Sequence, residues 1–358
     1  MNSEIINKVD DYVIFFTMEG VVVMGFNLTI EKFDEHLETL RREYKVYAPV
    51  MIKGKGTFAD TDTIRYKEIE SISEVEFDLK SDFSPKEIIL PITQTLFYFT
   101  EKDCEEPKID EKKILIFLRS CDIHAMRRLD EIYLRNGNED YYYKTLRDKI
   151  KFVLMGCSES FENCFCASMG SNKTEDYDMY TKIQDDEVFV NCKSEELMNY
   201  FNIDKISEVK VEPEFVQTNE IKVTIPENLD QRVFKSKMWD EYSSRCIACG
   251  RCNFVCGTCS CFTMQDIFYK ENKNVGERRR VWASCHVDGY SDMAGGHGFR
   301  KDKKDRMRFK VMHKVYDFEK RAGYHMCIGC GRCDDICPEY ISFSNCVNKL
   351  NKAMDEVE

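Results

Sequence analysis

The sequence lacks an apolar run long enough to cross a membrane. Its most apolar stretch, Tyr12–Phe26, is interrupted by Glu19 and Gly20 and is shorter than the roughly 20 residues that a transmembrane helix needs. Residues Met1–Asp11 are polar and have no basic segment of the kind that begins a secretory signal peptide. We therefore expect a soluble, cytoplasmic protein with no membrane partner.

An excess of positive charge is also missing. The chain has 64 acidic residues against 52 lysines and arginines, a net charge of −12 and a pI near 5.2. This balance argues against a nucleic-acid partner. The sequence has no glycine-rich dinucleotide motif after a strand, no P-loop and no nucleophile elbow. We therefore expect no nucleotide site, and we assign no catalytic residue.

Cysteine, by contrast, is abundant, with 18 in the chain. Two runs share one spacing, in which three cysteines at every third position are followed by a fourth after three more residues. The runs are Cys246, Cys249, Cys252 and Cys256, and then Cys327, Cys330, Cys333 and Cys337. This is the thiolate spacing of bacterial iron–sulfur sites, so the two runs predict two [4Fe–4S] clusters.

The fourth cysteine of each run is predicted to bind the cluster of the other run, as in two-cluster ferredoxins. The predicted ligand sets are Cys246, Cys249, Cys252 and Cys337 for the first cluster, and Cys327, Cys330, Cys333 and Cys256 for the second. Structural zinc is one alternative, but it uses paired C-x2-C knuckles rather than three equally spaced cysteines. Disulfides are the other alternative, and a reducing cytosol disfavours them.

A further group of cysteines lies in the first part of the chain. Two of its members each follow an apolar run that is typical of a buried strand, and the other two form a C-x-C pair. If the two strands are neighbours, all four thiols meet at one edge of a sheet. We therefore predict a third cluster, although small buried cysteines would be the ordinary alternative. The four residues are Cys121, Cys157, Cys164 and Cys166.

The roles of several other cysteines stay open. Cys259 and Cys261 could replace Cys256 as a ligand or pack near the cluster, and the proline that usually follows the fourth cysteine is replaced by Gly257. The role of Cys285, in the long insert between the runs, is also open. The isolated residues Cys104, Cys192 and Cys346 are expected to be structural.

Basic residues cluster between Arg300 and Lys310, where seven basic residues accompany two acidic ones. Against the acidic background of the chain, this stretch could dock an acidic partner. An ordinary solvated helix face is the alternative, and the sequence does not decide between the two.

The chain is predicted to have an α+β fold with two domains. Residues 1–235 alternate strand-like runs with helical patterns and are expected to form a mixed α/β domain. Residues 236–350 are expected to form a helical ferredoxin-type domain, with one helix over Phe262–Lys270 and another over 307–318 that ends near Gly323. The strand-like runs are Val13–Phe16, Val21–Val23, Lys45–Tyr47, Ile114–Leu118, Phe152–Leu154 and Val188–Val190, and the main helical stripe is Ile30, Phe33, Leu37, Leu40 and Tyr44.

Around the cysteine runs, the sequence resembles a known family, the iron–sulfur subunits of anaerobic sulfite reductases. More loosely, the whole chain resembles the iron–sulfur beta subunits of soluble sulfhydrogenases, including at Ser120–Asp122 and Cys164–Cys166. The segments similar to the sulfite reductase subunits are Arg245–Cys256, Phe262–Ile267, Arg280–Cys285, Asp292–His297 and Cys327–Ser342.

The resemblance implies an electron-transfer subunit in a complex that reduces sulfite to sulfide with NADH. A flavin subunit would accept hydride from NADH, a sirohaem subunit would bind sulfite, and this chain would pass electrons between them. Two alternatives stay open. One is the beta subunit of a sulfhydrogenase, and the other is a stand-alone reductase of a sulfur species that uses the N-terminal cluster.

Overall fold

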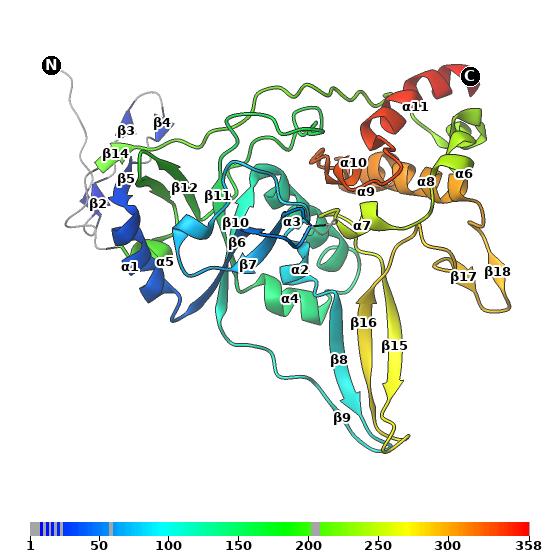
Figure 1. The fold of residues 1–358 in the computed structure, drawn as a ribbon, viewed down its shortest axis with the longest axis horizontal. Helices are drawn as coiled ribbons and strands as arrows, with labels where there is room; N and C mark the ends of the chain where they lie inside the picture. The colour runs from blue at the N-terminus through cyan, green and yellow to red at the C-terminus, as the bar shows by residue number, and fades with distance from the viewer. Residues whose placement is uncertain are drawn as a thin grey trace.

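The computed structural model describes residues 24–56, 60–201 and 208–357, together with four short strand segments near the N-terminus (Figure 1). Its main sheet has eight strands in the order β14-β5-β13-β12-β11-β10-β6-β7. In chain order these are β5 (Met24–Thr29), β6 (Tyr44–Ile52), β7 (Thr63–Glu68), β10 (Lys113–Arg119), β11 (Ile150–Met155), β12 (Met179–Gln184), β13 (Glu187–Cys192) and β14 (Glu208–Lys210). Strands β6, β10, β11 and β12 are parallel, whereas the pairs at the two edges are antiparallel.

Helices cover both faces of this sheet, and the alternation of side chains along β10 explains how. Phe117 packs with Phe33 on one face, whereas Leu118 packs with Met126 on the other. Successive residues of a strand point to opposite faces, so an uninterrupted apolar run suits a strand that is buried on both sides. The covering helices are α1 (Ile30–Leu40) on the first face, and α3 (Ser120–Tyr133) and α4 (Tyr141–Arg147) on the second.

Most of the strand-like runs in the first part of the chain are strands in the structure. The runs beginning at Lys45, Ile114, Phe152 and Val188 lie in β6, β10, β11 and β13. The helical stripe is confirmed up to Leu40, but Tyr44 already belongs to β6. The runs Val13–Phe16 and Val21–Val23 lie partly outside the described residues.

The last third of the chain is built mainly from helices around a second hydrophobic core. The helix expected over residues 307–318 is confirmed, and Gly323 closes it with a left-handed backbone, φ 78°. This agrees with glycine's low cost in the left-handed region. The helices are α6 (Glu241–Arg245), α7 (Arg251–Phe254), α8 (Lys303–Met312), the π-helical turn η5 (His313–Asp317), α9 (Phe318–Ala322), α10 (Arg332–Asp335) and α11 (Phe343–Val357).

The prediction of a helix over Phe262–Lys270 is wrong, because this segment forms strand β15 (Phe262–Phe268). It pairs antiparallel with β16 (Gly276–Trp282), which in turn pairs with β8 (Thr93–Phe99) and so gives the segment a ladder of backbone hydrogen bonds. A tertiary pairing of this kind overrides weak local preferences. Figure 1 shows β8, β15 and β16 projecting together from the body of the molecule.

The predicted combination of a mixed α/β part with a helical iron–sulfur part, an α+β fold, is confirmed. Strand β8 comes from the first part and β16 from the second, so the projecting sheet joins the two.

The remaining elements are short. They are β1 (Lys8–Val9), β2 (Tyr12–Val13), β3 (Phe16–Thr17), β4 (Gly20–Val21), η1 (Ile72–Glu74), α2 (Lys86–Ile89), β9 (Cys104–Glu105), α5 (Glu195–Met198), η3 (Gln231–Lys235), η4 (Lys237–Trp239), β17 (Asp292–Met293) and β18 (His297–Gly298).

Among the described residues, no helix is both long enough and apolar enough to cross a membrane.

Candidate iron–sulfur sites

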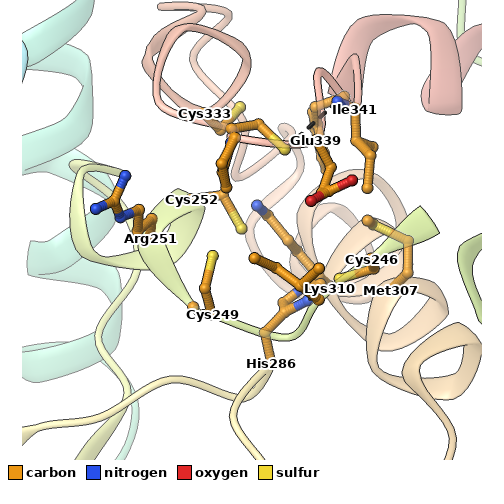
Figure 2. A pocket seen from close by; sticks show the side chains of 15 residues that line it. Cys246, Cys249, Arg251, Cys252, His286, Met307, Lys310, Cys333, Glu339 and Ile341 are labelled. Atoms are coloured by element: carbon orange, nitrogen blue, oxygen red, sulfur yellow. Dashed lines mark hydrogen bonds between the residues drawn. The ribbon is translucent and has the colours of Figure 1, made fainter. Parts of the chain in front are cut away.

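Three cysteines of the first run line a cavity of about 500 Å³ next to helix α8, which we call the first cavity (Figure 2). In Figure 2, Cys249 comes from the loop before α7, Cys252 from α7 itself and Cys333 from α10. Cys246 and Cys337 also line this cavity. The four cysteines predicted to hold the first cluster therefore surround one space, although their coordination of iron stays a prediction.

The second cavity, of about 360 Å³, lies on the other side of Cys333. It is lined by Cys327, Cys330 and Cys333 of the second run and by Cys256 of the first. These are the four residues that the crossed pairing predicts for the second cluster. Cys333 lines both cavities, so the two cysteine groups lie next to each other.

The two cysteine loops reach these positions through backbone conformations with positive φ. The residues concerned are Ala248 (φ 59°), Gly250 (φ 76°), Gly329 (φ 63°) and Gly331 (φ 72°). In this geometry the Ala248 N–H donates to Cys246 Sγ and the Gly329 N–H donates to Cys327 Sγ, both at 3.4 Å. Such hydrogen bonds favour the thiolate form and tune the potential of a bound cluster.

Two buried lysines on one helical face lie beside these sulfurs. Lys310 lines both cavities, and Lys314 donates to Cys256 Sγ at 3.5 Å and to Thr258 Oγ1 at 2.6 Å. Burial by itself would lower the pKa of each amine, but the neighbouring cysteine sulfurs raise both pKa values above the usual range. Both lysines therefore remain cations beside groups that carry negative charge when they bind iron.

Sequence reasoning missed these lysines, although the pattern contained a signal. Lys310 and Lys314 share the helical face of Met307, Val311 and Val315, the apolar residues that predicted the helix. A charged residue on an apolar stripe is seldom buried without a partner. Its presence next to a cysteine-rich segment could have indicated a buried anionic site.

The four N-terminal cysteines also line one space, the third cavity, of about 320 Å³. Strands β10 and β11 are parallel neighbours with Arg119 opposite Met155, so Cys121 and Cys157 emerge at the same sheet edge. Cys164 and Cys166, on the loop that follows, complete the lining. The strands before Cys121 and Cys157 are therefore neighbours, as the prediction of a third cluster required. The cluster itself stays a prediction.

Three cations surround the third cavity. Arg119 donates to Cys157 Sγ at 3.4 Å, Lys80 lies 3.8 Å from Cys164 Sγ, and Arg332 lines the wall. Burial is the main reason that the pKa of Cys164 rises to about 12 and that of Cys166 to about 11. These thiols therefore stay protonated until a metal competes for the sulfur, as metal ligation requires deprotonation.

The donor set of the three cavities fits [4Fe–4S] clusters, since each cavity offers at least four cysteine sulfurs and at least one buried cation. Within the described parts of the chain, no three His, Cys, Asp or Glu side chains are arranged closely enough to share a single metal ion.

The second and third cavities are joined by direct contacts between their loops. The Cys164 thiol donates to the Cys330 carbonyl at 3.5 Å, and the Phe165 N–H donates to the Gly329 carbonyl at 2.7 Å. Beneath them, Arg332 forms a fully buried ion pair with Asp122 at 2.6 Å. The second cavity therefore adjoins both the first and the third.

Two of the basic residues in the stretch Arg300–Lys310 do not belong to an exposed surface, whereas docking by the other basic residues stays a prediction. Arg306 and Lys310 are buried in α8, and Arg306 donates to the His286 carbonyl at 3.1 Å. Its guanidinium also pairs with Asp288 at 3.1 Å. The helix turns these two side chains inward. For Arg306 and Lys310, the predictions of a docking surface and of a solvated helix face are therefore both wrong.

Of the remaining cysteines, Cys104 is exposed and Cys346 is buried in the core of the last third. Cys192 donates to the Ser194 carbonyl at 3.4 Å. None of these three lines a cysteine cavity described above, in agreement with a structural role. Cys259, Cys261 and Cys285 lie beside the first two cavities but do not line them.

The fold and the paired cysteine loops indicate a ferredoxin-type iron–sulfur protein, and comparison with known families agrees. Residues 245–341 match the family model of the 4Fe-4S dicluster domain. This match covers both cysteine runs and the insert between them. It supports [4Fe–4S] clusters in this part of the chain.

Over nearly its whole length, the chain is similar to sulfhydrogenase 2 subunit beta of Pyrococcus furiosus. The two are 29% identical over 345 residues, which cover 90% of this chain and 97% of the relative. No solved structure matches the chain. The comparison supports an iron–sulfur subunit of the beta type, whereas the assignment to sulfite reductase stays a prediction.

Proposed function

We propose that this chain is an electron-transfer subunit of a multi-subunit oxidoreductase of the sulfhydrogenase type, with three neighbouring [4Fe–4S] clusters. The observation that supports it most is that three cysteine-lined cavities adjoin one another, with the second next to each of the others. The first and second share Cys333 and Lys310, and the second and third are joined by the Cys164–Cys330 contact. A series of closely spaced sites is suited to moving electrons through a protein.

When bound, each [4Fe–4S] cluster accepts and releases one electron at a time. The chain's own residues would hold the clusters and set their potentials. Lys314 and Lys80 place positive charge beside the sulfurs, and backbone N–H groups donate to Cys246 and Cys327. Both effects favour the more negative, reduced state of a cluster.

The name of the relative supports a complex of the sulfhydrogenase type, since the relative is called a sulfhydrogenase subunit. On this proposal the chain hands electrons to or from separate partner subunits in the cytoplasm and has no catalytic site for hydrogen. The natural complex, purified anaerobically, is expected to evolve hydrogen from reduced methyl viologen and to lack the absorption bands of sirohaem. Sirohaem bands together with sulfite reduction would refute this choice.

The number of clusters has its own test. Anaerobically reconstituted chain is expected to bind about twelve iron atoms, at four per cubane cluster. The variant Cys157→Ser should lose about four of them, because it removes one ligand of the third site. Cys104→Ser, at an exposed and isolated cysteine, is the matched control and should lose none. About eight iron atoms in both the wild type and Cys157→Ser would reduce the proposal to two clusters.

Sulfite reduction is the second candidate function, supported by the resemblance of segments such as Arg245–Cys256 and Cys327–Ser342 to sulfite reductase subunits. In that complex the partners would be a flavin subunit that oxidises NADH and a sirohaem subunit that reduces sulfite. NADH-dependent sulfide formation from sulfite by the purified complex would support it, and the absence of both flavin and sirohaem would exclude it.

A further inference from the structure

A fourth cavity, separate from the three cysteine cavities, lies where the two parts of the chain meet. Its volume of about 760 Å³ exceeds that of each cysteine cavity and falls within the roughly 300–1,000 Å³ that is typical of small-molecule sites. Arg65, Phe83 and Ile92 line it from the first part of the chain, whereas the cysteine loops and β16 supply the other walls. Small-molecule sites often occur at such junctions between domains.

The walls of the fourth cavity are mainly aromatic and held in place. Phe83, Phe254 and Trp282 contribute three aromatic side chains. The Trp282 Nε1–H donates to the Leu90 carbonyl at 2.9 Å, so the indole ring keeps one orientation. Aromatic walls that are already fixed favour a planar ring system, because little ordering is required when it binds.

Two arginines line the same cavity, but they differ in their partners. The Arg65 guanidinium is paired with Glu87 at 2.7 Å and stacks on the Phe83 ring at 4.2 Å. The Arg251 side chain is exposed and has no hydrogen bond or ion pair with any residue that the structure describes. Arg251 also borders the first cavity, but Figure 2 shows its side chain extending away from the cysteines there. Its charge is therefore available to an anion.

The aromatic walls and the unpaired cation together indicate the class of ligand. A purely apolar molecule would leave the Arg251 charge without a partner, and an inorganic anion would leave the aromatic walls uncovered. A planar aromatic ring system that carries a phosphate matches both features. Its ring would lie against Phe83 and Trp282, and a guanidinium can hold a phosphate with two parallel hydrogen bonds.

The fourth cavity also borders the two C-terminal cysteine loops. Three of its lining residues each directly precede a predicted cluster ligand. They are Arg251 before Cys252, Val255 before Cys256, and Ile336 before Cys337. A ligand in this cavity would therefore lie beside the predicted ligands of both the first and the second cluster.

We propose that the fourth cavity binds a planar aromatic molecule that carries a phosphate, the chemistry shared by flavin mononucleotide and purine nucleotides. This goes beyond the transfer of electrons between partners, because it gives the chain a small-molecule site of its own. Sequence motifs did not predict the site, since its residues come from segments far apart in the chain.

The first test measures binding to the anaerobically reconstituted full-length protein by isothermal titration calorimetry. The probes are flavin mononucleotide and AMP, together with riboflavin and adenosine, which have the same rings without phosphate. We expect the phosphorylated form of the tighter-binding ring to bind roughly tenfold tighter than its unphosphorylated form. The tighter of the two phosphorylated probes assigns the site to a flavin or to a purine nucleotide. No measurable binding of either at about 1 mM would overturn the proposal.

Two variants separate recognition of the phosphate from recognition of the ring. Arg251→Gln should weaken binding of the phosphorylated probe roughly tenfold and leave the unphosphorylated probe unchanged, because only the phosphate contact is lost. Phe83→Leu should weaken both probes roughly threefold to tenfold, since it replaces an aromatic wall with an aliphatic one. Arg245→Gln is the matched control, at an exposed arginine of the same cysteine run that does not line the cavity, and should bind like the wild type.

A third variant keeps the test decisive if Arg251→Gln disturbs the neighbouring cysteine loop. Ile92 is 49% exposed, so Ile92→Asp should preserve the iron content while its carboxylate repels the phosphate and weakens binding roughly tenfold. Met293→Asp, at an exposed apolar residue of β17, is its control. Unchanged binding of the phosphorylated probe in both Arg251→Gln and Ile92→Asp would overturn the proposal. The electron-transfer function is judged separately, by the iron count of the wild type and Cys157→Ser.

Discussion

Single buried charges give the two C-terminal sites their electrostatic character. Lys310 and Lys314 are each less than 5% exposed, and placing a charge in so dry a position is costly unless an opposite charge lies nearby. The protonated lysines are therefore best explained by anionic thiolate-bound clusters beside them. Their effect should appear in the reduction potentials of those clusters.

Replacing Lys314 with methionine should make the second cluster harder to reduce. The substitution removes a positive charge that lies 3.5 Å from Cys256 Sγ. We expect the potential to fall by on the order of 50–100 mV, given that about 59 mV corresponds to a tenfold change in a one-electron equilibrium. A redox titration followed by electron paramagnetic resonance measures this. Lys304→Met, at a half-exposed lysine of α8, is the control, and equal potentials in the two variants would contradict the prediction.

The crossed pairing of cysteines makes a second prediction at this scale. Cys256→Ala should damage the cluster of Cys327, Cys330 and Cys333, since Cys256 lines their cavity and not that of its own run. The resonance spectrum of the reduced protein should lose the signal of one cluster and keep that of the other. The identity of the lost signal is fixed by comparison with Cys330→Ala. Loss of the signal that depends on Cys249 would show that the fourth cysteines are not exchanged.

At the scale of elements, the loop before α10 is fitted tightly against the loop of the third cavity. A Cβ at Gly331 would lie 2.3 Å from the Asn163 carbonyl oxygen, and one at Gly329 would lie 2.5 Å from that of Phe165. Both glycines have positive φ. The second run therefore needs glycine at both positions for two reasons. Glycine adopts positive φ at low cost, and its missing Cβ lets the loop of the third cavity approach closely.

Gly331→Ala should accordingly destabilise the protein more than a substitution that only introduces positive-φ strain. Gly54→Ala is the matched control, since Gly54 has φ 63° and a Cβ there would meet nothing within 4 Å. We expect a cost of about 1–2 kcal/mol for the control and about 1–3 kcal/mol more for Gly331→Ala from the clash. Anaerobic thermal unfolding followed by circular dichroism compares them. Equal Tm values for the two variants would show that the Asn163 loop moves aside freely.

At the scale of the whole molecule, the two parts of the chain hold each other through buried contacts. Asp122 of α3 is fully buried and pairs with Arg332 of α10, and β8 of the first part pairs with β16 of the second. Breaking a buried ion pair by removing one partner costs about 3–5 kcal/mol, because a charge is left without compensation. The domain boundary expected near residue 235 stays a prediction. Moving the two parts of the chain away from each other would break these contacts.

Removing the clusters should unfold much of the last third of the chain. Its short helices α7 and α10 line the first two cysteine cavities. Where metal ligands form much of a core, binding energy is folding energy. Chelation and oxidation should therefore lower the helical signal in circular dichroism, while the signal from the main sheet persists. An apo-protein with its full helical signal would show that the hydrophobic core around Trp239 and Leu350 is sufficient by itself.

Sequence patterns predicted the elements that are defined by local spacing. The apolar run Ile114–Leu118 gave a buried strand, and the stripe through Met307 and Val311 gave a helix, because burial repeats at a fixed period along each element. The error at Phe262–Phe268 has a physical cause. This segment is an edge strand whose conformation depends on pairing with β16, a partner that local spacing does not reveal.

The ferredoxin spacing of the two four-cysteine runs can be read without any structure, since the reach of a short loop around a cluster fixes that spacing. Which thiols from distant segments meet depends instead on how the strands and helices pack. The parallel pairing of β10 and β11 brings Cys121 and Cys157 to one cavity, which Cys164 and Cys166 also line. Helix packing also turns Lys310 and Lys314 toward the sulfurs. These contacts join residues far apart in the chain, so they follow from strand register and helix packing rather than from any local pattern.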